Sequence, residues 1–201
     1  ALILFFEPVL FIWVSIIIGA VIASLLQHFF IVRKIPAFTF PFVVVTWVLM
    51  YLMTHVLHIA PSKLLSQVPS LSQDFMFAFR GYGQVIFQSA TLAGVLFFIG
   101  VFIHTPLAAI YGLVAAIIAG ATSSWFGISN IDVNMGLYSY NAILCALVFA
   151  GDKLEDGIWV FISILISIFI SWAMWYFKLS ALTFPFVAAT WITLLIKKVL
   201  K

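Results

Sequence analysis

The chain has 201 residues, of which 66% are apolar and 7% carry a charge, and its formal net charge is +3. No soluble domain of this length can bury so much apolar surface, so soluble enzymes and soluble binding modules are excluded. A few basic residues between apolar runs are typical of membrane loops and give no reason to expect a nucleic-acid partner. The composition therefore predicts an all-α integral membrane protein, because runs of about 20 apolar residues can cross a hydrocarbon core of ~30 Å.

The apolar runs divide the chain into a series of expected helices. The full or nearly full runs lie at 8–32, 39–58, 107–126, 158–177 and 183–196, after a helix tail at 1–6. Two shorter runs lie at 92–103 and 136–150, and Asn130 and Asp132 mark a loop. The segment 74–88 is amphipathic, and it is too polar and too short to cross the membrane. The single Cys145 lies in an apolar run, so no disulfide is expected.

A sequence repeat relates two of these helices. Thr39–Val43 reads Thr-Phe-Pro-Phe-Val and recurs at Thr183–Val187, 144 residues later, and each copy is followed by Thr-Trp. Such a match around a proline indicates a duplicated membrane unit, and duplicated units usually enclose a substrate path at their interface. We expect the end of a first repeat at 1–60, an inter-repeat loop at 61–73 and a second repeat at 74–201. Nothing precedes Ala1 that would match 65–144, so we expect the first repeat to be incomplete here.

Charged residues predict how the copies are oriented. If successive spans cross the membrane in alternating directions, one membrane face carries most of the basic residues: Arg33, Lys34, Lys153, Lys197, Lys198 and Lys201. Lys63 and Lys178 fall on the other face. The positive-inside rule then places the first group and the C-terminus in the cytoplasm. The two copies consequently run in opposite directions, as two inverted homologous repeats.

The two repeated threonines are the first candidates for a pore. A helix over 183–196 is only about 21 Å long, shorter than the hydrocarbon core. We therefore expect each repeated helix to begin inside the membrane after an extended stretch, with Thr39 or Thr183 as its N-cap and proline in its first turn. Irregular backbone at that depth survives where it lines a polar cavity or is buried in protein.

Two further motifs lead to a family. Arg80–Gln88 reads Arg-Gly-Tyr-Gly-Gln-Val-Ile-Phe-Gln, and Gly136–Leu144 reads Gly-Leu-Tyr-Ser-Tyr-Asn-Ala-Ile-Leu. Together with the doubled Thr-Phe-Pro-Phe they resemble the urea transporter (urea channel) family, in its bacterial type. The resemblance implies two homologous halves, each with five spans and a tilted half-membrane helix. It also implies a passive urea-selective pore in each subunit of a homotrimer, in the inner or plasma membrane.

The resemblance also assigns pore residues. It implies that the half-helix motif supplies backbone carbonyls and a polar side chain, that aromatic and leucine side chains form a flat slot, and that the threonines flank the narrow middle. The half-helix residues would be Gln84 and Val85. The slot residues would be Phe87, Tyr140 and Leu144, and the threonines would be Thr39 and Thr183. Ser89-Ala90 stand where asparagines are usual and Tyr140 where Phe is common. Both departures leave ammonia or a urea analogue open as the solute.

The chemistry of urea agrees with such a site. Urea is planar, neutral and rich in N–H donors, and it must lose most of its water to enter a narrow pore. The last carbonyls of a half-helix lack helical partners, so a row of them can replace those hydrogen bonds. A slot without a full charge does not hold ions strongly, and a weak path with several sites lets the solute leave.

Each assignment has a plainer alternative. Thr39 and Thr183 are also suitable helix caps, Gln84 can satisfy a buried backbone group, and Phe87 and Leu144 alone would be lipid-facing or core residues. We expect Arg80 to neutralise an acidic partner or a helix end.

Other functions fit the sequence less well than a channel does. A coupled transporter would need a carboxylate or histidine relay inside the spans, whereas the acidic residues lie at their ends. An intramembrane enzyme would need a nucleophile with a base, or a metal cluster, which the spans do not contain. His55 and His58 have no third ligand nearby, so neither metal nor cofactor is expected. A structural subunit stays open but leaves the polar half-helix unexplained.

Overall fold

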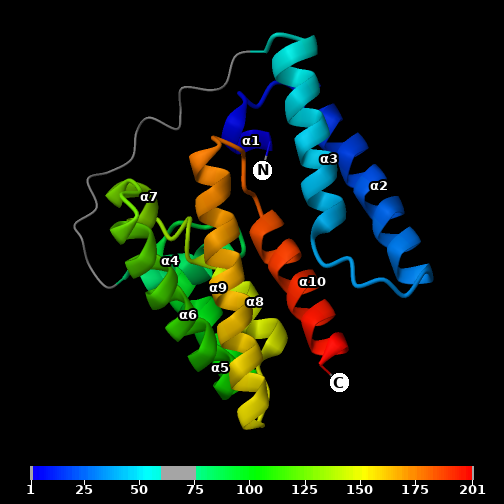
Figure 1. Ribbon diagram of the computed structural model, residues 1–201. Helices are drawn as coiled ribbons and strands as arrows, with labels where there is room; N and C mark the ends of the chain where they lie inside the picture. The colour runs from blue at the N-terminus through cyan, green and yellow to red at the C-terminus, as the bar shows by residue number, and fades with distance from the viewer. Residues whose placement is uncertain (1, 60–75, 201) are drawn as a thin grey trace. The chain divides into compact units, whose positions relative to one another are not determined.

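The computed structural model describes residues 2–59 and 76–200, and all the elements within them are helices (Figure 1). The expected inter-repeat loop at 61–73 lies outside the described residues. Contacts divide the chain into unit 1, which comprises Ala1–Pro69 and Leu182–Val187, and unit 2, which comprises Ser70–Ala181 and Ala188–Lys201. The all-α fold class predicted from composition is therefore confirmed. Within the described residues three helices, Leu10–Val32, Pro106–Trp125 and Leu154–Tyr176, are long and apolar enough to cross a membrane.

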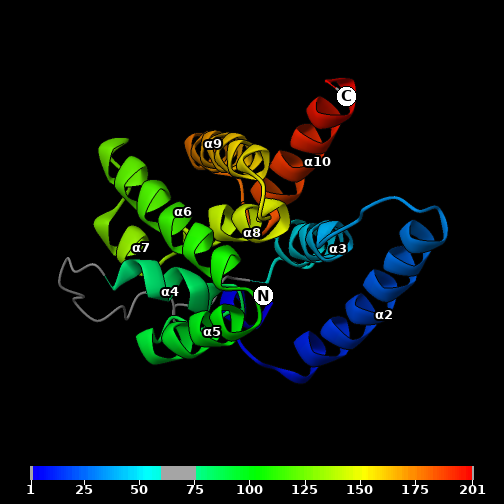
Figure 2. The same ribbon diagram turned by 90° about the horizontal axis from the view of Figure 1, so that it is seen from below.

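Unit 1 is built around a pair of helices. Its elements are α1 (Leu2–Phe5), α2 (Leu10–Val32), α3 (Phe40–Tyr51) and a π turn, η1 (Leu52–Val56), that continues α3. Helices α2 and α3 pack side by side (Figure 2). Phe6, Ile12 and Met53 are buried together at one end of the pair, while most of the outer face of α2 is exposed and apolar, as a lipid-facing helix requires.

Unit 2 holds the remaining helices. They are α4 (Phe77–Gln84), α5 (Thr91–His104), α6 (Pro106–Trp125), α7 (Asn130–Asn134), α8 (Tyr140–Phe149) and α9 (Leu154–Tyr176). Helix α10 (Phe184–Val199) begins with residues of unit 1 and continues in unit 2. Helix α8 packs against α6 and α9, and α4 packs against α5 and α6. Two of the expected elements differ: Asn130 and Asp132 lie in the short helix α7 rather than a loop, and the helix of the 74–88 segment covers only Phe77–Gln84.

The sequence repeat is accompanied by a repeat of local structure. Helices α2 and α9 both have 23 residues, and α9 begins and ends at the same 144-residue offset that separates Thr39 from Thr183. Both helices end in a Schellman turn, with Lys34 and Lys178 in left-handed backbone at φ of 56° and 55°. Phe38 and Leu182, just before the threonines, are also left-handed, at 48° and 44°. The relative orientation of the copies stays a prediction.

Small residues bring α6 close to α4. Gly112, Ala115, Ala116, Ala119 and Gly120 form a buried stripe along α6, as the small-residue pattern of this run suggests. A Cβ atom added to Gly112 would collide with the Tyr82 hydroxyl, and one added to Gly120 would collide with the ring of Phe77. The Tyr82 ring is fully buried and its hydroxyl donates to the Ala109 carbonyl over 2.6 Å. These glycines therefore let two aromatic rings of a short helix reach the backbone of a long one.

We expect Gly112→Ala to destabilise the protein by about 1–3 kcal/mol, the usual cost of overpacking a filled core. Thermal unfolding of the purified protein in detergent measures this. The matched control is Gly100→Ala on α5, where an added Cβ meets nothing within 4 Å. Equal melting temperatures for the two variants would contradict the close approach of α4 and α6.

Candidate functional site: a threonine pair and a short polar helix

The predicted pore residues are divided between the two units. Thr39 and Thr183 belong to unit 1, whereas Gln84, Val85, Phe87, Tyr140 and Leu144 belong to unit 2.

The two threonines of the sequence repeat meet. Their Oγ1 atoms are 2.7 Å apart and share a hydrogen bond, with either hydroxyl as the donor. Thr39 occupies the N-cap position of α3, as predicted, but its side chain makes no capping hydrogen bond. Its hydroxyl pairs with Thr183 instead, so capping is not what this side chain does. The pairing brings the starts of two helices far apart in sequence into contact within unit 1.

Phenylalanines adjoin both threonines in the sequence, and their rings take part in aromatic pairs between the two segments. Phe38 and Phe186 pack edge to face with centroids 5.4 Å apart, and Trp47 and Phe184 lie 5.1 Å apart. Thr183 is 8% exposed. Hydrogen bonds gain strength in such apolar surroundings because little water competes for them. The pair thus places two hydroxyls, each able to donate and to accept, next in sequence to phenylalanines that make these ring contacts.

Gln84 is the last residue of α4, and its side chain is anchored. Its Nε2 donates to the Met135 carbonyl over 2.8 Å. Gln84 therefore satisfies a backbone group, which is the simpler of the two roles considered for it. That bond uses one hydrogen of the side-chain amide. The side-chain carbonyl oxygen takes no part in it and can still accept a hydrogen bond. A pore role for Gln84 stays a prediction.

The carbonyls at the end of α4 are less open than expected. The amides of Val85, Ile86 and Phe87 bond to the carbonyls of Tyr82, Gly83 and Gln84, and the Gln88 amide also bonds to Gly83. Phe87 is left-handed, with φ of 59°, which makes this a Schellman cap. The expectation that these carbonyls are unpaired is therefore wrong. The Tyr82 and Gln84 carbonyls each accept one of these bonds and keep a second lone pair for another donor, whereas the Gly83 carbonyl accepts two.

The remaining predicted residues lie around α4 and α8. Val85 is partly buried and packs on a core that contains Tyr82, Ala116 and Ile143. Phe87 is 49% exposed. Tyr140 and Leu144 are partly buried and stand one helical turn apart on the same face of α8.

The two motifs of unit 2 approach each other closely. Gly81 of α4 lies against the Ser139 side chain, and Gly136 lies against the backbone of Arg80 and Gly81. Gly136 is left-handed, with φ of 77°, so a side chain would be both strained and blocked there. Helix α4 and the start of α8 therefore form one packed element.

Arg80 has a structural role, which the sequence predicts only in part. It is 5% exposed, its Nε donates to Thr91 Oγ1 and its NH1 donates to the Asn134 carbonyl, both over 3.0 Å. The prediction that Arg80 serves a helix end is confirmed, since Asn134 ends α7. Thr91 and Asn134 were missed. The available signal was a lone arginine in an apolar chain, which must find partners when it is buried.

The described acidic residues offer no buried carboxylate. Glu7, Asp152 and Glu155 are exposed, and Asp132 and Asp156 are partly exposed. Among residues 2–59 and 76–200, no group of three or more His, Cys, Asp or Glu side chains is placed to hold a metal ion. Serines recur every fourth residue on α9, where Ser163, Ser167 and Ser171 are buried. This spacing suits close helix packing in lipid.

Comparisons with known proteins agree on one family. The family model described as "Urea transporter" matches residues 1–198. Urea transporter 1 of Ovis aries and urea transporter 1 of Capra hircus are each 28% identical to the chain over 86 residues. These matches cover 43% of the chain and 22% of each relative, so the chain spans far less than the length of either curated protein.

We expect Thr39→Val and Thr183→Val to be coupled in stability, because either change removes the same hydrogen bond. Interhelical hydrogen bonds in membrane proteins contribute about 0.6 kcal/mol, and at most about 1.7 kcal/mol. A double-mutant cycle on the free energy of unfolding measures the coupling. Thr39→Val with Thr54→Val is the control, because Thr54 bonds to its own helix at Met50. Additive effects of Thr39→Val and Thr183→Val would contradict the pairing.

Proposed function

Because the chain belongs to the urea transporter family, whose members are transport proteins and not enzymes, we propose that it forms part of a passive, channel-like pathway for urea. The structural observation that supports this is the hydrogen bond between Thr39 and Thr183. It joins the two copies of a repeated motif at the starts of two helices. Paired starts of this kind suit a constriction shared by both repeats.

A hydroxyl pair matches the needs of urea. The solute carries N–H donors on two sides and one carbonyl acceptor, and it loses water on entering a narrow path. Two hydroxyls that already share a hydrogen bond keep one proton to donate and further lone pairs to accept. They can exchange donor and acceptor roles by rotation, so they can replace water without a fixed charge. Neutral contacts hold the solute weakly enough for it to leave.

The other predicted residues would complete the pathway. Gln84 and Val85, with the second lone pairs of the Tyr82 and Gln84 carbonyls, would provide acceptors along one edge of urea. Phe87, Tyr140 and Leu144 would provide the flat walls of a slot. In this proposal the pore lies between the repeats of each subunit of a homotrimer in the inner or plasma membrane, with the C-terminus in the cytoplasm.

An ion- or proton-coupled transporter, or a channel for ammonia or an amide, is the alternative. Coupling needs an ionisable group that gains or loses charge inside the protein. The acidic residues within the described ranges are exposed or partly exposed, which favours the uncoupled mechanism.

We expect urea flux into proteoliposomes containing this protein to be independent of an imposed proton or sodium gradient. Stopped-flow light scattering measures it, with glycerol as the control solute. Flux that requires either gradient would replace the channel with a coupled transporter. If ammonia or a small amide passes while urea does not, that solute replaces urea in the proposal.

We expect Thr183→Val and Gln84→Ala each to slow urea flux several-fold while leaving membrane insertion unchanged, because each removes a polar partner of the solute. Thr54→Val is the matched control for loss of a hydroxyl, since its bond is local. Flux per inserted molecule is the measurement. Normal flux in both variants would remove these residues from the pathway.

A further inference from the structure

A hollow of about 380 Å³ opens between the start of α9 and the end of α10, both in unit 2. Its polar lining consists of two ammonium groups, on Lys153 and Lys197, and two carboxylates, on Glu155 and Asp156; Ile158 and Trp159 add apolar surface. This volume lies within the ~300–1,000 Å³ range of small-molecule sites. None of these side chains belongs to the pathway proposed for urea.

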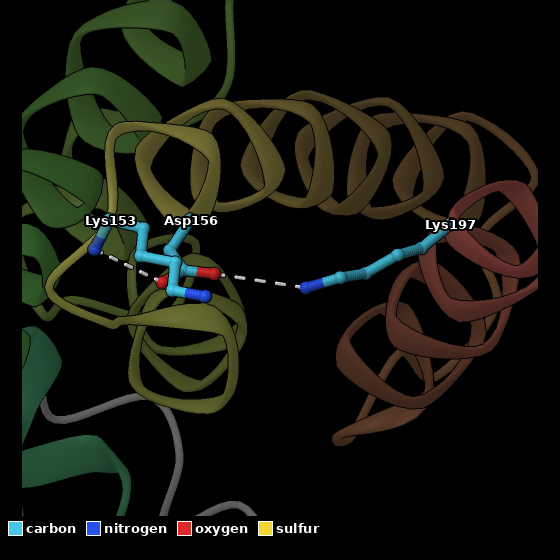
Figure 3. Close-up of polar contacts among 3 residues, drawn as sticks. All are labelled: Lys153, Asp156 and Lys197. Carbon is cyan, nitrogen blue, oxygen red and sulfur yellow. Dashed lines mark hydrogen bonds and ion pairs between the residues drawn. The ribbon is translucent and has the colours of Figure 1, made fainter. Parts of the chain in front are cut away.

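Asp156 lies at the centre of the polar contacts. Its Oδ2 accepts a hydrogen bond from the Lys153 amide over 3.3 Å, and its Oδ1 is 3.8 Å from the Lys197 ammonium. Figure 3 shows Lys153 and Asp156 at the start of α9 and Lys197 extending toward them from α10. The Lys197 ammonium also lies 5.7 Å from the centre of the Trp159 ring.

The ion pair across the hollow is loose. A charge-assisted hydrogen bond from an ammonium to a carboxylate is usually about 2.7–2.9 Å long, well short of the distance found here. The Lys197 and Asp156 side chains are 30% and 24% exposed. Both groups therefore keep hydrogen-bonding capacity for a third molecule that enters between them.

The position of the hollow at the end of a candidate membrane span suits the interface between headgroups and hydrocarbon. Helix α9 is a candidate span, and the hollow is at its first turn, where the polar residues end and the apolar run begins. Tryptophan gathers at such interfaces, and long lysine side chains extend from the apolar region toward the headgroups. Ile158, Phe161 and Leu165 continue from the hollow along α9 as an exposed apolar stripe, which suits an acyl chain.

We propose that this hollow binds the headgroup of a zwitterionic phospholipid, phosphatidylethanolamine. Its phosphate would lie between Lys153 and Lys197, and its ammonium would donate hydrogen bonds to Glu155 and Asp156. The balanced charges of the lining support this choice, because an anionic headgroup could pair with the two lysines but would leave the two carboxylates without a cation. A choline headgroup has no N–H with which to bond them. The proposal is independent of the solute that the protein transports.

The test is thermal unfolding of the full chain in phosphatidylcholine nanodiscs, with and without dioleoyl phosphatidylethanolamine. Dioleoyl phosphatidylglycerol at the same mole fraction is the anionic arm, and soluble phosphoethanolamine is the free-headgroup arm. We expect phosphatidylethanolamine to raise the melting temperature most. Lys197→Gln and Glu155→Gln should each lose most of that rise, whereas Lys198→Gln, a neighbouring exposed lysine outside the hollow, should keep it.

The comparison is made within each variant, between discs with and without the lipid, so a general loss of stability does not imitate the effect. An equal or larger rise with phosphatidylglycerol would overturn the choice of headgroup. A rise with soluble phosphoethanolamine as large as with the lipid would overturn the bilayer as its source. Retention of the full rise in Lys197→Gln and Glu155→Gln would overturn the site.

Discussion

Every backbone amide and carbonyl that this chain places at membrane depth needs a partner within the protein, because hydrocarbon offers none. A long helix such as α2 or α9 meets that need internally. The short helix α4 does not, since its eight residues reach only about 12 Å. Helices α5, α6, α7 and α8 of unit 2 all contact this one short helix.

The enclosure of α4 uses several kinds of contact. The Schellman cap closed by Phe87 pairs its final carbonyls, while Arg80 and Gln84 tie it to the backbone of the α7 region. Glycines on α6 and before α8 allow its rings and backbone to approach without gaps. A polar helix end is thereby held rigidly inside an apolar domain. Rigid placement is also what recognition of a small planar solute demands, because a loosely held acceptor cannot replace water at low cost.

The threonine pair shows how a repeat can supply a symmetric contact. Each copy ends a long helix with a left-handed lysine and places a left-handed residue before its threonine. Left-handed backbone at a residue other than glycine costs about 1–2 kcal/mol. The same costly conformation at corresponding positions of both copies indicates that this approach to the threonine matters to both. The two hydroxyls that result lie within hydrogen-bonding distance.

The sequence by itself determined the membrane class, the helical content, most helix positions and the repeated motif, because these depend on local hydrophobicity and on residues adjacent in the chain. The repeat also relates Thr39 to Thr183 as corresponding positions, but it does not predict the hydrogen bond between them. The α4 carbonyls are paired locally, by amides three to five residues further along the chain. The partner of Gln84 and the anchors of Arg80 were decided only by tertiary structure. So was the gathering of Lys153, Asp156 and Lys197 around one hollow. For Gln84, Arg80 and Lys197 the partner lies outside the helix that carries the side chain, and local pattern carries no record of which distant group will be within 3 or 4 Å of it.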